Sequence, residues 1–328
     1  MKLYICGNGF DLHHNLPTSY GHYKKYLQEK YPGIFKDYEY FQFLSIKNDS
    51  DKWSDIESAL CIDYEELFNY YVCENYPDLS SDSDSRWCEM EVNIEVLTRF
   101  INDFTGRCFF EWIYKANEVE TIADLDFDKD SLFINFNYTN TLQRLYNITD
   151  SSILHIHGSL KNIDVNDILW KDVCSDCSTM EEIEAYGILI DGDKWSNDYI
   201  REELQFGATG ITAEQVKRYL ISHYEDDDFY SASIEPAIAR LVDFVKKSTK
   251  NIEDNYDDLK NFILGKDIDE IIIMGVSLSD SDDGYYSDIL VPQFKNVKWV
   301  FMLHGDNLDR IEKFIYRHGL VYVNIKEW

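Results

Sequence analysis

Residues 2–11 read KLYICGNGFD, a short apolar run that ends in Gly7-Asn8-Gly9 and decides the fold that we expect. Residues 2–6 are predicted to form a strand, and the run from Leu3 to Cys6 shows no alternation of apolar and polar side chains, which is typical of a strand buried on both faces of a parallel sheet. Two glycines directly after such a strand let the backbone approach a ligand closely, with its amides facing a phosphate. The third glycine of the dinucleotide-binding fingerprint would fall at Leu12, so a tight strand-exit turn explains the motif equally well.

Five further apolar runs resemble this first strand, and they lie near residues 131–137, 153–157, 270–276, 297–303 and 320–325. Between the last two, residues 307–318 have the apolar spacing of a helix, and Gly319 follows as a C-terminal stop. This strand–helix–strand order predicts an α/β fold with a Rossmann-like parallel sheet that helices cover on both faces.

Two long stretches, at about 18–130 and 161–268, interrupt the predicted sheet. Apart from a loop region up to about residue 210, we expect them to be mostly helical, with helices near 18–31, 53–76, 88–117, 212–224, 231–247 and 252–264. Residues 1–328 contain no internal repeat, so we expect a single α/β domain. Its helical insertions would roof the carboxyl edge of the sheet.

The composition limits the classes of partner. The chain of 328 residues has 31 basic and 61 acidic side chains, which gives a formal net charge of −30. Such a charge repels nucleic acids and anionic membranes unless the basic residues are concentrated in one place. The densest basic group is Lys246, Lys247 and Lys250, on a predicted helix beside acidic residues. We therefore expect neither a membrane nor a nucleic acid as partner.

The cysteines and the apolar runs indicate a cytoplasmic protein. The seven cysteines are odd in number and scattered, which argues against a disulfide framework. No apolar stretch approaches the ~20 residues that span a bilayer, and the run from Leu3 to Cys6 is too short for a signal-peptide core. Cys174 and Cys177 lack the second pair of a zinc ribbon, so we expect no metal.

Two of the predicted strands end in side chains suited to catalysis. Asn137 follows the second strand, and its amide can hold a ribose hydroxyl or orient a water. Thr139 beside it is expected to cap the following helix. His157 ends the third strand and is a candidate general base, whereas His155 fits a core position better. By strand alternation, both histidines should face the same side.

The fourth strand ends in the run GVSLSDSD, residues 275–282. Ser277 and Asp282 in this run could bind sugar hydroxyls, whereas Asp280 and Ser281 are read as caps of the next helix. Because parallel strands end at one edge of a sheet, the four strand ends together predict a polar-ligand pocket there.

Taken together, these motifs resemble the AbiH-type bacteriophage abortive-infection family. The blocks that carry the resemblance are GNGFDL (7–12), LPTSY (16–20), WSDIESAL (53–60), FNYT (136–139), HIHG (155–158), and GVSLS (275–279) with Asp282 and the pair Tyr285-Tyr286. They follow the family's order and span nearly the whole chain. One position departs from it, because the family usually has a histidine where this chain has Val276.

The order of the blocks is also similar to the sirtuin-like NAD-binding fold. In that group the glycine turn holds the NAD phosphates, and Asn and His flank the nicotinamide ribose. The resemblance therefore implies catalytic roles for Asn137 and His157. It further implies that NAD, as substrate or ligand, is bound by Gly7, Asn8, Gly9, Asp11, Ser277 and Asp282. Deacylating sirtuins carry a four-cysteine zinc module after the His-Gly block, which is incomplete here, so protein deacylation is not expected.

The expected function is thus a cytoplasmic abortive-infection effector with a sirtuin-like nucleotide pocket that hydrolyses NAD to nicotinamide and ADP-ribose. Two alternatives stay open: a non-catalytic nucleotide sensor or regulatory module, and an effector that acts on another nucleotide or on nucleic acid. A homo-oligomer or a phage-derived trigger is a further expected partner. Glu57 would gain an acid/base role if it were accessible near His157.

Overall fold

Six parallel strands form one continuous sheet at the centre of the α/β part of the molecule. The computed structural model describes residues 1–45, 53, 56–73, 89–128, 130–163, 197–208, 212–222, 228–250, 252–303 and 308–328. The strands are β1 (Lys2–Cys6), β2 (Leu132–Asn135), β3 (Ile153–His155), β4 (Glu270–Met274), β5 (Lys298–Leu303) and β6 (Val323–Glu327). Their order across the sheet is β3-β2-β1-β4-β5-β6. The predicted all-parallel α/β sheet is confirmed.

Several strands end earlier than their apolar runs predict. β2 ends at Asn135, β3 at His155 and β4 at Met274, so Asn137, His157 and Val276 all lie in the loops that follow. These three side chains are therefore placed by loop geometry rather than by strand alternation.

The direction of winding reverses between β1 and β4. β2 and β3 lie on one side of β1, and β4, β5 and β6 lie on the other. Cys6 at the end of β1 is in register with both Asn135 and Met274, so three strand ends stand side by side. In open α/β sheets, such a switch point leaves a crevice at the carboxyl ends of the strands, where ligands bind.

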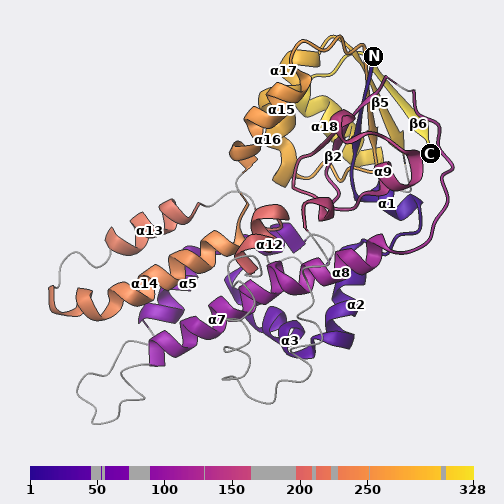
Figure 1. The fold of residues 1–328 in the computed structure, drawn as a ribbon. Coiled ribbons are helices and arrows are strands. Elements are labelled where there is room, and N and C mark those ends of the chain that lie inside the picture. Colours follow the sequence, from indigo (N-terminus) through magenta and orange to yellow (C-terminus); the bar gives the residue numbers. More distant parts are fainter. Residues whose placement is uncertain are drawn as a thin grey trace.

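Each face of the sheet has its own apolar core, because successive side chains point to opposite faces. Leu3 and Ile5 pack on one face against α15 (Tyr256–Ile263), α17 (Val291–Phe294) and α18 (Leu308–His318). Tyr4 and Cys6 pack on the other face with side chains from α1 (Asn8–His13) and α9 (Thr141–Tyr146). Helices thus cover the sheet on both faces (Figure 1).

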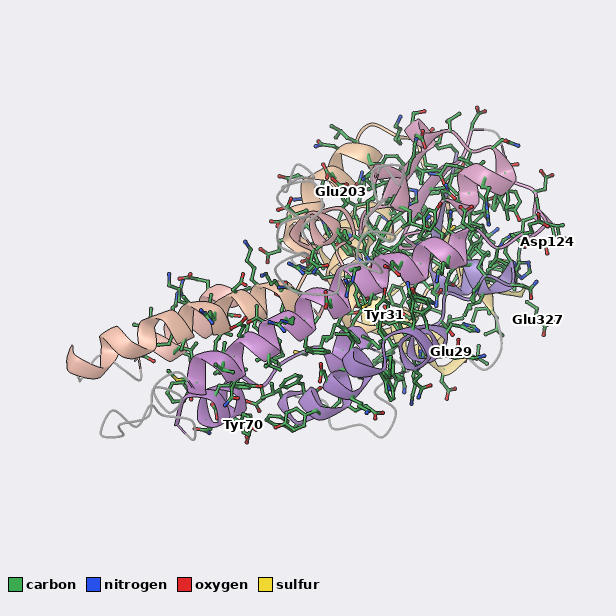
Figure 2. All side chains as sticks on the ribbon, turned by 60° about the horizontal axis from the view of Figure 1, so that its bottom comes forward. Glu29, Tyr31, Tyr70, Asp124, Glu203 and Glu327 are labelled. Carbon is green, nitrogen blue, oxygen red and sulfur yellow. The ribbon has the colours of Figure 1, made fainter. Side chains whose placement is uncertain are left out.

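A separate layer of helices lies against the carboxyl edge of the sheet. The first insertion contributes α2 (Tyr20–Lys30), α3 (Pro32–Phe41), α4 (Ile56–Ala59), α5 (Tyr64–Phe68), η2 (Asn69–Cys73), α7 (Glu89–Thr105) and α8 (Arg107–Asn117). The second contributes α12 (Asn197–Glu203), α13 (Ala213–Ser222) and α14 (Asp228–Ser248). Figure 1 shows α7 and α14 running side by side below the sheet, and Figure 2 shows Tyr70 at the far end of this layer from Asp124 and Glu327.

The helical layer has its own core, which Tyr23, Phe104, Phe109 and Leu241 help to build. Within it, two predicted helices are broken. The helix expected over 53–76 is replaced by the short α4 and α5 and a further turn, and the helix expected over 88–117 is interrupted at Gly106. A Cβ at Gly106 would lie 2.6 Å from the side chain of Asn197, so α12 packs there against bare backbone.

None of the helices that the structure describes is long and apolar enough to cross a membrane. The predicted CxxC pair, Cys174 and Cys177, falls outside the described residues, as does Asp55 of the Trp/Asp/Glu motif.

Candidate functional site

The loops after β1 and β4 are joined backbone to backbone through three glycines. The Gly7 amide donates to the Met274 carbonyl at 3.0 Å, and the Gly9 amide donates to the Gly275 carbonyl at 2.8 Å. Gly275 has a φ of +65°, and a Cβ on it would lie 2.3 Å from the Phe10 nitrogen. The glycines are thus explained by this close approach. The expectation that their amides face a phosphate is wrong, because both are already bonded to carbonyls.

A cavity of about 620 Å³ opens at this junction, between the sheet edge and the helical layer. All eight predicted site residues line it: Gly7, Asn8, Gly9, Asp11, Asn137, His157, Ser277 and Asp282. The helical layer supplies the opposite wall, chiefly through Tyr20, Trp53, Glu57, Phe109 and Trp112. The residues that the sequence singled out therefore share one pocket. Their roles there stay a prediction.

Asn137 is held by its amide nitrogen. Its Nδ2 donates to the Gly7 carbonyl at 2.9 Å, and its backbone amide donates to Asn135 Oδ1 at 3.1 Å. The side chain is 6% exposed. Among the described residues no donor is bonded to its Oδ1, so this oxygen is available to a hydroxyl or a water in the cavity.

Asp11 is a buried carboxylate that ties the β2 loop to α1. Its Oδ2 accepts a hydrogen bond from Thr139 at 2.7 Å, and its Oδ1 accepts one from Thr141 at 2.8 Å. Burial raises the pKa of Asp11 to about 6, although both threonine hydroxyls and Arg144 oppose the rise. The expected cap by Thr139 is wrong, because α9 has Asn140 at its N-cap and the Thr139 hydroxyl is bonded to Asp11 instead.

Asn8 and Ser277 lie nearer to solvent than the other polar candidates. Asn8 Oδ1 accepts a hydrogen bond from Thr18 at 2.6 Å, which connects the glycine loop to the start of the helical layer. Ser277 donates to Ser279 at 3.2 Å within the β4 loop. Val276 also lines the cavity, so an apolar wall stands where the family usually has a histidine.

The two histidines lie in different surroundings, contrary to the strand alternation. His155 is bonded to Gln143 at 3.0 Å and to the Asn137 carbonyl at 3.2 Å, and it does not line the cavity. His157 is 3% exposed, and its ring meets the ring of Phe136 edge-on at 5.3 Å. His157 Nε2 lies 3.3 Å from Asp282 Oδ1.

A buried lysine organises this part of the pocket. Lys250 Nζ lies 2.7 Å from Glu57 Oε2, 3.3 Å from Asp282 Oδ1 and 3.4 Å from His157 Nε2. Its side chain is 1% exposed. We call these four residues the buried quartet. It links the β3 and β4 loops to both helical insertions.

The charges in the quartet stabilise one another. Burial alone would lower the pKa of Lys250, but the charges of Asp282 and Glu57 outweigh burial and raise it. Burial alone would likewise raise the pKa of Asp282, yet Lys250 and His157 hold it well below its usual range. Lys250 and Asp282 are therefore both ionised at neutral pH.

Sequence reasoning missed Lys250, which it noted only with Lys246 and Lys247 as the densest basic group on a predicted helix. Lys250 follows the end of α14 and is buried, whereas Lys246 is exposed. The one available signal was the position of Lys250 just beyond the apolar periodicity of that helix. Glu57 was noted only as a conditional candidate, and the structure places it in the cavity wall, joined to His157 through Lys250.

In the described part of the chain, no group of three or more His, Cys, Asp or Glu side chains is arranged to hold a metal ion.

The fold and the site together define an α/β protein with a cavity, lined by polar side chains, at the switch point of a parallel sheet. The sequence model of the bacteriophage abortive infection AbiH family matches residues 3–303, nearly the whole chain. The chain therefore belongs to the AbiH family of bacteriophage abortive-infection proteins. No curated protein and no solved structure was found to match it.

Proposed function

We propose that this abortive-infection protein binds NAD in the switch-point pocket and hydrolyses the bond between nicotinamide and ribose. Family membership implies a role in anti-phage abortive infection, and consumption of NAD would be its effector activity. The observation that carries the proposal is the convergence of Asn137 and His157 on one cavity beside the glycine junction.

The strand order supports a nucleotide as ligand. The order β3-β2-β1-β4-β5-β6 is that of the doubly wound Rossmann sheets, which bind dinucleotides across the reversal point. The cavity lies at this point and is larger than a single base or sugar requires. Because the Gly7 and Gly9 amides are occupied, we expect a phosphate to bind Arg310, which is the Lys or Arg side chain that lines the cavity among the described residues.

The chemistry follows from the two side chains. Asn137 Oδ1 would accept a hydrogen bond from the attacking water and hold it near the ribose. If its proton is on Nε2 and donated to Asp282, His157 has a lone pair on Nδ1 that can accept a proton. The water oxygen bonds to the ribose carbon, and the electrons of the breaking carbon–nitrogen bond neutralise the nicotinamide ring. The proton lost from the water passes to His157.

The test is incubation of the purified protein with NAD, with nicotinamide and ADP-ribose followed by chromatography. Asn137→Ala and His157→Ala should each reduce turnover by about 100-fold or more, because each removes a group that acts on the reacting water. Asn261→Ala is the matched control, since Asn261 is exposed on α15 and does not line the cavity. If both pocket variants hydrolyse NAD at the wild-type rate, the proposal is wrong.

A non-catalytic nucleotide sensor is the second candidate. The quartet favours it, because a ligand entering beside Glu57 and Asp282 would act on the contact between the helical layer and the sheet. Saturable binding of NAD without product, measured by calorimetry, would support the sensor. A change in assembly on binding, or binding only in the presence of a phage component, would identify what it regulates.

A further inference from the structure

The four residues of the quartet differ in how they meet the cavity. Glu57, Asp282 and His157 all line it, whereas Lys250 does not. The ammonium group therefore stands behind the two carboxylates, inside the protein. A ligand in the cavity meets the negative groups first and the positive group only beyond them.

The charge of this wall is fixed by its burial. Two carboxylates, Glu57 and Asp282, face the single ammonium group of Lys250, so negative groups outnumber positive ones among these three residues. The Glu57 carboxylate is shared, since its Oε1 accepts from Tyr20 at 2.7 Å and its Oε2 from Lys250. Lys250 holds both carboxylates in place, and its charge keeps the pKa of Asp282 well below its usual range. In such a partly dry site, a net charge acts more strongly than it does in water.

A second feature indicates that this wall faces a ligand. Asn137 is more than nine-tenths buried, lines the same cavity, and among the described residues has no partner for Oδ1. Because Asn137 lines the cavity, a water or a donor on a ligand there can complete the hydrogen bonding of this oxygen.

We propose that Glu57 and Asp282, held by Lys250, form an anionic wall that selects the cationic ring of oxidised NAD over the neutral ring of NADH. This inference rests on the proposed function and names the form of the ligand that the site takes. The same wall stabilises the positive charge that develops on the ribose as nicotinamide leaves. Lys250 acts here as a positioning residue, because it stands behind the carboxylates.

The experiment compares the affinities of NAD and NADH by calorimetry at constant ionic strength. The wild-type protein should bind NAD about tenfold more tightly than NADH, because the two differ by one positive charge next to the wall. Glu57→Gln and Asp282→Asn remove one negative charge each at nearly unchanged size, and each should reduce this ratio several-fold. A purely structural role would weaken both ligands equally and leave the ratio unchanged.

Asp283→Asn is the matched control. Asp283 is the next residue in the chain, pairs with Arg317 and His318, and does not line the cavity, so its removal should preserve the wild-type ratio. Equal affinity of the wild-type protein for NAD and NADH would contradict the selection by the anionic wall but not the binding of a nucleotide in the pocket. Absence of binding by either ligand would overturn the proposed function and this inference together. An unaltered ratio in both Glu57→Gln and Asp282→Asn would assign the selection to other residues.

Discussion

Replacement of Lys250 by methionine should destabilise the protein strongly and in a pH-dependent way. Water cannot easily take the place of the ammonium group of Lys250 in the variant. The lysine side chain is 1% exposed, and its Nζ lies 2.7 Å from Glu57 and 3.3 Å from Asp282. Removal of one partner from a buried ion pair destabilises a protein by about 3–5 kcal/mol, since the remaining charge is left without compensation. Two carboxylates lose their partner here, so we expect the upper part of that range at pH 7.

The sign of the pH dependence follows from the pKa values. In the wild type, the pKa of Asp282 is held below its usual value, so its contribution is present above the unfolded pKa of about 3.9 and is lost as the pH falls through the folded pKa. In Lys250→Met, the lysine no longer opposes burial, and burial raises the pKa of Asp282. Asp282 then takes up a proton as the pH falls from 7, which relieves the folded state. The stability difference between wild type and variant should therefore shrink between pH 7 and pH 5.

Urea denaturation at pH 7 and pH 5 measures both effects, and Lys246→Met is the control. Lys246 is exposed on α14, four residues before Lys250, so its replacement should change the free energy of unfolding by at most about 0.5 kcal/mol. If Lys250→Met matched this control, the lysine would not be holding a buried charge. A large loss in the free energy of unfolding that was the same at pH 7 and pH 5 would also contradict the reasoning, since it would indicate lost packing rather than an uncompensated charge.

Two further stability predictions concern the glycine junction and Asp11. Gly275→Ala should destabilise by about 3 kcal/mol or more, because its Cβ would lie 2.3 Å from the Phe10 nitrogen at a φ of +65°. Gly265→Ala, with a φ of +69° and open space around it, should destabilise by only about 1–2 kcal/mol. If Gly275→Ala and Gly265→Ala lowered the temperature of thermal unfolding by similar amounts, the close approach of Gly275 to Phe10 would be refuted. Asp11 has its folded pKa raised to about 6, so its contribution to stability is lost as the pH rises from about 4 through 6. The wild type should lose about 2–3 kcal/mol relative to Asp11→Asn between pH 4 and pH 7, and parallel stability profiles would contradict this.

The sheet was predictable because the strands are short-range features. All six apolar runs form strands, and the run from Lys2 to Cys6 has the predicted limits. Strand ends were less predictable. The strand runs include Asn137 and His157, but the chain leaves the sheet two residues earlier in each case. Residue preferences do not encode where a neighbouring strand stops offering hydrogen bonds.

The pocket was predictable in its membership but only partly in its contacts. Parallel strand ends must meet at one edge, which brought Asn137, His157 and Asp282 together correctly. The partners of each side chain depend on residues far away in the sequence. Thr139 binds Asp11, 128 positions earlier, and Lys250 binds Glu57, 193 positions earlier. No local pattern around Lys250 or in the helix predicted over 53–76 indicates that the two residues meet.

The ion pair between Lys250 and Glu57 also has a consequence during synthesis of the chain. Glu57 leaves the ribosome early, but its partner Lys250 and the facing Asp282 are made only in the last quarter of the chain. Until then the helical segment that carries Glu57 has neither the buried cation nor the β4 loop against which it closes. A nascent or truncated chain therefore has no complete pocket. Under the proposed function, NAD hydrolysis would therefore begin only after most of the chain has been translated.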